Sequence, residues 1–142
     1  MLAAHGVTSL LVDLDDTLIP STSDEPAVGA FEWLAGLKAA GLAVAILSNG
    51  RRERVAQFAK QAEVPALAMA GKPFASAFNR ARALLGSPEA ATMAMVGDQL
   101  FTDIVGARRA GMVSILIRPL TKGKLPHTRI ARHLERMFLK ER

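Results

Sequence analysis

The sequence contains no cysteine, no tyrosine and one tryptophan. Without cysteine the chain can form neither a disulfide framework nor a thiolate metal site, which is typical of proteins from a reducing compartment. No apolar run approaches the roughly 20 residues that a membrane-spanning helix needs. The first residues also lack the basic and then apolar pattern of a secretory signal. We therefore expect a cytoplasmic protein without a membrane span.

The net charge of +5 is concentrated towards the C-terminus. From Arg118 onwards the chain carries eight Lys or Arg residues and two Glu, whereas acidic residues slightly outnumber basic ones elsewhere. Residues 127–139 within this basic segment have the apolar spacing of an amphipathic helix. Such a helix either packs its apolar stripe on the domain or lies on an anionic membrane surface. Nucleic acid is the least favoured partner, because aromatic side chains for base stacking are scarce.

Short apolar runs alternate with segments of helical spacing along nearly the whole chain. Continuous apolar strands that alternate with helices predict an α/β fold with a parallel sheet covered by helices on both faces. A chain of 142 residues is expected to form one such domain. Ser23 or Asp24 is expected to cap the first helix, with Pro26 in its first turn. We predict strands at about 10–12, 42–47, 66–70, 92–96 and 113–117, and helices at about 27–40, 51–62, 74–85 and 101–110.

Polar residues follow four of the predicted strands, at the edge where open parallel sheets bind their ligands. Clustered carboxylates raise each other's pKa unless a cation offsets them. If the first strand continued, Asp13 and Asp15 would share one face. One could then attack phosphorus or hold a metal while the other handles a proton. The residues at the four strand ends are Asp13 and Asp15, Ser48 and Asn49, Lys72, and Asp98 with Asp103 five positions later.

Each of these groups also has a plain structural interpretation when it is taken alone. The first is an acidic turn, Ser48-Asn49-Gly50 is a helix cap, Lys72 is a surface lysine, and Asp98 caps a helix. In the functional interpretation a hydroxyl and helix N-terminal N–H groups hold a phosphate, and a lysine offsets its charge. The aspartates then complete an oxygen-ligand site for a hard cation such as Mg²⁺. The ordered coincidence of all four groups favours function.

The four groups, in their order along the chain, resemble the four motifs of the haloacid dehalogenase (HAD) superfamily. Gly97–Asp103, the Ser48-Asn49 pair and the Arg-rich C-terminal segment further resemble the YqeG-type, subclass IIIA phosphatases, which are similar to phosphatidylglycerophosphate phosphatases. This narrower group more often has Asn where Asp16 stands, and often a basic residue where Gly71 stands. The motifs read Asp13-Leu14-Asp15-Asp16-Thr17, Ser48, Lys72-Pro73 and Gly97-Asp98-Gln99-Leu100-Phe101-Thr102-Asp103.

The resemblance implies a role for each site residue. Asp13 would be the nucleophile that forms an aspartyl-phosphate, and Asp15 the general acid and then the base. Thr17 would brace their loop. The phosphoryl group would be held by Ser48, Asn49 and Lys72. Mg²⁺ would be held by Asp13, Asp98 and the backbone carbonyl of Asp15, while Asp103 would either assist the metal or fix Lys72.

The segments between the motifs are too short to contain the cap domain that many members of this superfamily insert. We therefore expect one three-layer, Rossmann-like, HAD-like domain over residues 1–142, with a parallel sheet of about five strands and an open site. An open site suits a bulky phosphorylated substrate, with phosphatidylglycerophosphate favoured, or one covered by a neighbouring chain of a homo-oligomer. The alternatives are a phosphatase of a soluble sugar or nucleotide phosphate, and a non-catalytic protein that binds phosphate, membrane or RNA.

Overall fold

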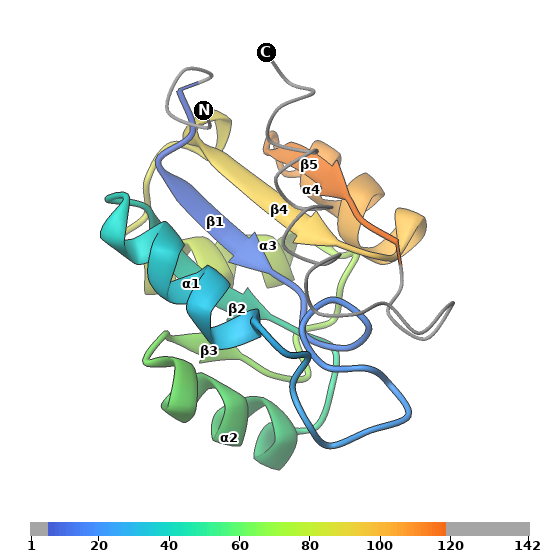
Figure 1. The fold of residues 1–142 in the computed structure, drawn as a ribbon. Helices are drawn as coiled ribbons and strands as arrows, with labels where there is room; N and C mark the ends of the chain where they lie inside the picture. Colours follow the sequence, from blue (N-terminus) through green and yellow to red (C-terminus); the bar gives the residue numbers. More distant parts are fainter. Residues whose placement is uncertain (1–5, 119–142) are drawn as a thin grey trace.

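The computed structural model of this chain describes residues 6–118 (Figure 1). Within this range five parallel strands form one sheet in the order β3-β2-β1-β4-β5. The predicted basic helix at 127–139 lies outside the described residues. The strands are β1 (Ser9–Val12), β2 (Ala43–Leu47), β3 (Ala66–Leu67), β4 (Met93–Gly97) and β5 (Val113–Leu116), and the α-helices are α1 (Ala30–Ala39), α2 (Arg52–Ala62), α3 (Ala75–Leu84) and α4 (Gly106–Arg109).

The central strand β1 is buried on both faces, and its alternating side chains divide the core into two halves. Leu10 and Val12 pack with α1 and α2 on one face, whereas Leu11 packs with α3 and α4 on the other. All three side chains are fully buried, which explains why the run is continuously apolar. The predicted three-layer α/β fold with helices on both faces is therefore confirmed.

The position of β1 determines where the polar residues gather. β1 pairs in register with β2 on one side and β4 on the other, so Val12 lies opposite both Ile46 and Val96. The chain leaves these three strands at nearly the same level. The residues that follow them therefore meet at one edge of the sheet (Figure 1).

Most predicted boundaries lie within one residue of those in the structure, and three elements differ by more. The first helix begins at Ala30 rather than at 27, after Gly29 with φ 91° and without a side-chain cap, so the capping role of Ser23 or Asp24 is wrong. β3 ends at Leu67 because the backbone turns at Met69, where φ is 47°. The helix predicted at 101–110 divides into a π-helical segment, Leu100–Val105, and the short α4.

The described chain contains no domain inserted between its strands. A loop and α1 connect β1 to β2, and α2 alone connects β2 to β3. The carboxyl edge of the sheet is accordingly open over residues 6–118. No helix in this range has the length and apolar character that crossing a bilayer requires.

We predict that Gly106→Ala destabilises the contact between α3 and α4. A Cβ at this position would overlap the ring of Phe78, which is fully buried, and would lie 3.2 Å from the Cα of Pro73. Such overpacking typically lowers the free energy of unfolding by about 1–3 kcal/mol. Urea unfolding measures this change. In the matched control Gly36→Ala, on the exposed side of α1, the new Cβ meets nothing within 4 Å, and stability should rise by up to about 1 kcal/mol. Equal stability of the two variants would contradict the packing described here.

Candidate active site

A buried lysine joins two buried aspartates at the carboxyl edge of the sheet. Lys72 Nζ donates to Asp13 Oδ1 over 2.9 Å and to Asp103 Oδ1 over 2.6 Å. The three residues are 6%, 7% and 0% exposed respectively. Because they are separated by 59 and 31 positions in the sequence, only the fold brings them together. The site therefore contains an ion triad that is almost completely removed from water.

The electrostatics of the triad follow from this burial. Burial alone would lower the pKa of Lys72, but the charges and hydrogen bonds of Asp13 and Asp103 outweigh it and raise that pKa above its usual value. Burial raises the pKa of Asp13, and the attraction of Lys72 only partly opposes the rise. The lysine is thus firmly charged, whereas the negative charge at Asp13 is incompletely compensated.

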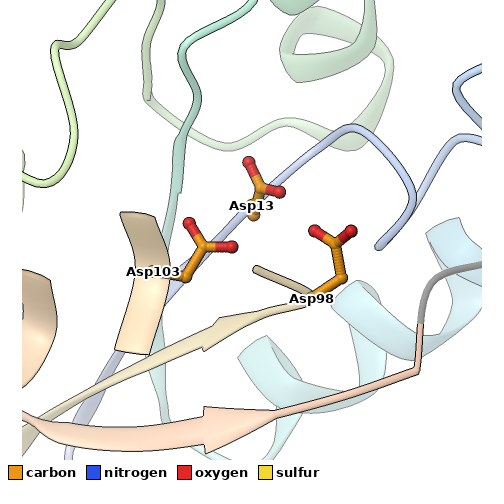
Figure 2. A group of neighbouring side chains, drawn as sticks. All are labelled: Asp13, Asp98 and Asp103. Carbon is orange, nitrogen blue, oxygen red and sulfur yellow. The ribbon is translucent and has the colours of Figure 1, made fainter. Parts of the chain in front are cut away.

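A third carboxylate, Asp98, adds to the excess of negative charge. Figure 2 shows the carboxyl groups of Asp13, Asp98 and Asp103 directed towards a common region, and one oxygen from each lies within 4.8 Å of the others. Asp98 Oδ1 is buried and accepts no hydrogen bond from the described residues. Burial also raises the pKa of Asp98, and the nearby charge of Asp103 adds to this effect. A cluster of hard oxygen atoms with too little positive charge fits a divalent cation.

Asp103 is held from two sides, which bears on its role. Its Oδ1 accepts from Lys72, and its Oδ2 accepts from the backbone N–H of Gln99 over 3.1 Å. The π-helical segment turns Asp103 inwards, and Gly97 leaves the space that its carboxyl group occupies, because a Cβ there would overlap that group. This geometry matches the expected function of fixing Lys72 more closely than direct metal binding.

Asn49 makes contacts that sequence reasoning did not anticipate. Its Oδ1 accepts from the backbone N–H groups of Gly71 and Lys72 over 3.1 and 2.8 Å, and its Nδ2 donates to the carbonyl of Lys72 over 3.2 Å. These bonds occupy the amide that was expected to hold phosphate. In this structure Asn49 fixes the backbone from which Lys72 projects.

Asp13 and Asp15 both lie in the loop that follows β1. β1 ends at Val12, so the two carboxylates do not lie on one strand face as predicted. Asp15 Oδ1 instead accepts from Arg54 Nε over 2.8 Å. Asp16 adopts φ 60°, which Asp and Asn tolerate better than most residues, and its Oδ1 accepts from the backbone N–H of Ser21 over 2.7 Å. Thr17 is buried, and its hydroxyl has no hydrogen-bond partner among the described residues. Its contribution to the loop is the hydrogen bond that its backbone N–H donates to the carbonyl of Leu14.

The triad opens into a cavity of about 210 Å³. The buried Ser48, whose Oγ accepts from the Gly50 N–H over 2.9 Å, lies in its wall. Gln99 and Thr102 contribute to the wall, and sequence reasoning missed them because neither residue type is diagnostic inside its motif. Asp98 and Asp103 lie beside Asp13 rather than in the wall. The lining residues are Asp13, Asp15, Ser48, Asn49, Gly50, Lys72, Gln99 and Thr102.

Comparison with known proteins places this site in a family. The model of the HAD-hydrolase-like family matches residues 69–134. YqeG of Bacillus subtilis, named a probable phosphatase, is 33% identical over 138 residues, which cover 97% of this chain and 80% of that protein. The aligned region therefore covers nearly the whole chain.

Two solved structures share the fold. An uncharacterized protein of Corynebacterium glutamicum has a TM-score of 0.70 and 22% identity, with 93% of this chain and 95% of that chain covered. The magnesium-bound structure of YfnB, a Bacillus subtilis protein assigned to the HAD hydrolases, has a TM-score of 0.59 and 21% identity, with 74% and 50% covered. At these identities the structures support the fold alone.

We predict that Lys72→Met destabilises the protein in a pH-dependent manner. Removal of one partner from a buried ion pair typically costs about 3–5 kcal/mol. The pKa of Asp13 is already raised in the folded protein, so the folded state binds this proton more tightly than the unfolded chain does, and stability falls as pH rises. Without the ammonium the pKa of Asp13 should rise further above its present value of about 8, so the loss should be larger at pH 9 than at pH 6. Urea unfolding of both proteins in metal-free buffer measures the difference, and an equal loss at the two pH values would argue against a charged triad.

Proposed function

This chain belongs to the YqeG-type phosphatases of the HAD superfamily, and we propose that it hydrolyses phosphate monoesters with Mg²⁺ through a phosphoryl group carried on Asp13. The observation that carries the proposal is the convergence of Lys72 with Asp13, Asp98 and Asp103 at one open cavity edge. Phosphoryl transfer depends chiefly on positioning and on compensation of charge. The site contains groups suited to both tasks.

The described residues fit a magnesium ion. Asp13 and Asp98, with the backbone carbonyl of Asp15, would hold it, and the unpartnered Asp98 Oδ1 is the observation that favours this assignment. Magnesium typically uses one or two carboxylates together with water and a phosphate oxygen. Its positive charge would offset both the carboxylates and the oxygens of the substrate phosphate. The magnesium-bound state of YfnB, which shares the fold, is consistent with this proposal.

Each proposed chemical step uses a side chain of this site. The Asp13 carboxylate attacks phosphorus while Asp15 gives a proton to the departing ester oxygen, so an alcohol leaves and an aspartyl-phosphate remains. Asp15 then removes a proton from water as the water oxygen attacks phosphorus. Inorganic phosphate leaves and the Asp13 carboxylate is restored. Lys72 and Ser48 bind phosphoryl oxygens throughout.

We expect Asp13→Asn to abolish hydrolysis of an aryl phosphate assayed with Mg²⁺, because the amide is a poor nucleophile. Asp15→Asn should lower kcat by about 10²–10⁴-fold, the usual contribution of a general acid, while inorganic phosphate still binds. Chelation of the metal should remove activity, and added Mg²⁺ should restore it. Glu32→Gln is the matched control, because Glu32 is an exposed carboxylate on α1 that lines neither cavity of the described residues. Retained turnover in Asp13→Asn would exclude the proposed nucleophile.

The favoured substrate is phosphatidylglycerophosphate, for which the open edge gives room. Exposed apolar side chains flank the catalytic cavity: Phe74, Leu100 and Phe101 are 71%, 63% and 66% exposed. Leu100 and Phe101 lie between two lining residues, and Phe74 follows Lys72 by two positions. Apolar side chains around the entrance suit a phosphate attached to a lipid. Peripheral contact with an anionic membrane, and cover by a second chain, stay predictions.

The second candidate is a phosphatase of a soluble sugar or nucleotide phosphate, which the small volume of the cavity favours. A non-catalytic binding function is set aside, because the chain belongs to a phosphatase family.

Substrate preference is measured by comparing kcat/KM for the lipid phosphate, presented in detergent micelles, with a panel of soluble sugar and nucleotide phosphates. We expect the lipid to have the highest value. A soluble substrate that exceeds it by about a hundredfold, or about 2.7 kcal/mol of transition-state stabilisation, would exclude the lipid.

A further inference from the structure

A second cavity, of about 400 Å³, lies beside the catalytic cavity. It is formed between the loop that follows β1 and the helix α2, which lie side by side in Figure 1. Its walls include Ile19 and Pro26 of the loop together with Glu53, Arg54, Gln57 and Gln61 of α2. None of these residues belongs to the four motifs.

Arg54 connects this cavity to the catalytic one. Its Nε donates to Asp15 Oδ1 over 2.8 Å, its Nη1 to Asp24 Oδ1 over 2.9 Å, and its Nη2 to the carbonyl of Pro20 over 3.3 Å. Asp15 lines the catalytic cavity, whereas Arg54 and Asp24 line the second one. The Asp15–Arg54 ion pair therefore stands between the two cavities.

The ion pair engages one oxygen of Asp15 and leaves the other directed towards the catalytic cavity. Oδ1 is bonded to Arg54, while Oδ2 would lie 3.0 Å from a Cβ placed on Gly50, a residue of the catalytic wall. A proton donor must reach the ester oxygen of the leaving group. The leaving group consequently has to pass on the side of Asp15, where the second cavity lies.

The chemistry of the second cavity indicates what kind of leaving group it would accept. Glu53, Gln57 and Gln61 are four positions apart, so they form one row on α2. All three are exposed, and they have no side-chain partner among the described residues. The carboxamides of Gln57 and Gln61 can both donate to and accept from hydroxyl groups, and the carboxylate of Glu53 can accept from them. Phe58 and Ile19 close the floor of the cavity but are only 2% and 3% exposed, so its accessible wall is chiefly polar.

We propose that the second cavity binds the leaving group of the substrate, and that this group carries hydroxyls on a short carbon chain, as a polyol does. The inference rests on the proposed function, since it takes Asp15 as the proton donor. Arg54 acts as a positioning residue that holds Asp15 at the border of the two cavities. Two sources share this chemistry: a free polyol or sugar phosphate, and the glycerol phosphate end of a lipid.

The test is the binding of three phosphates to the full chain with Mg²⁺, measured by calorimetry in an Asp13→Asn background so that the ligand is not consumed. The probes are sn-glycerol 3-phosphate, phosphatidylglycerophosphate in detergent micelles, and phenyl phosphate, which has no hydroxyl on its leaving group. Gln57→Ala combined with Gln61→Ala is compared with Lys60→Ala, a control exposed on α2 outside the cavity.

The double variant should weaken binding of at least one of the two glycerol phosphates about fivefold or more, because each lost hydrogen bond is worth about 1 kcal/mol. Phenyl phosphate should change by less than about twofold, and Lys60→Ala should change none of the three. Weakening of sn-glycerol 3-phosphate identifies a free polyol source, and weakening of the lipid alone identifies a headgroup. Parallel changes for all three probes, or no change for either glycerol phosphate, would overturn the proposal. Residual turnover in the Asp13→Asn background would instead count against the proposed function and is detected separately as released phosphate.

Discussion

The ammonium of Lys72, buried between Asp13 and Asp103, is the interaction on which the rest of the site depends. An uncompensated charge buried in this position would strongly destabilise the folded state. The neighbouring elements therefore hold the lysine and the two aspartates in contact. Asn49 holds the backbone of Gly71 and Lys72 through three hydrogen bonds, two of which are to Lys72. The π-helical segment turns Asp103 inwards, and the missing Cβ of Gly97 makes space for it. β1 supplies Asp13 from the centre of the sheet.

One ammonium does not balance three carboxylates, and this imbalance links structure to function. A protein selected only for stability would gain by replacing such a cluster with apolar side chains. The raised pKa values of Asp13 and Asp98, and the unpartnered Asp98 oxygen, are what a site would show if a bound cation were to complete its charges, as we propose. In the proposed function a divalent cation would supply the missing positive charge and would also offset the charge of a bound phosphate. The same deficit that disfavours the empty site would then favour binding.

The layered sheet and the meeting of the strand ends could be predicted from the sequence, because buried parallel strands appear as continuous apolar runs such as Leu10–Val12. The hydrogen-bond partners of individual side chains within the site could not be predicted in this way. Arg54 lies in a run of charged residues typical of a solvated helix, and only the loop after β1 brings Asp15 to it. Asn49 looked like a phosphate ligand, yet its partners are backbone groups 22 and 23 positions away. Side-chain partners that depend on loop geometry leave no periodic signal.

The central claim is that Asp13 attacks phosphorus within this site. The most direct measurement is to quench the reaction in acid during turnover of an aryl phosphate with Mg²⁺ and to locate the phosphoryl group by mass spectrometry of the peptides. The account predicts one phosphoryl group on the peptide that contains Asp13, accumulating further in Asp15→Asn, where the water attack lacks its base. A phosphoryl group on any other residue, or steady turnover with no covalent adduct in either protein, would contradict it.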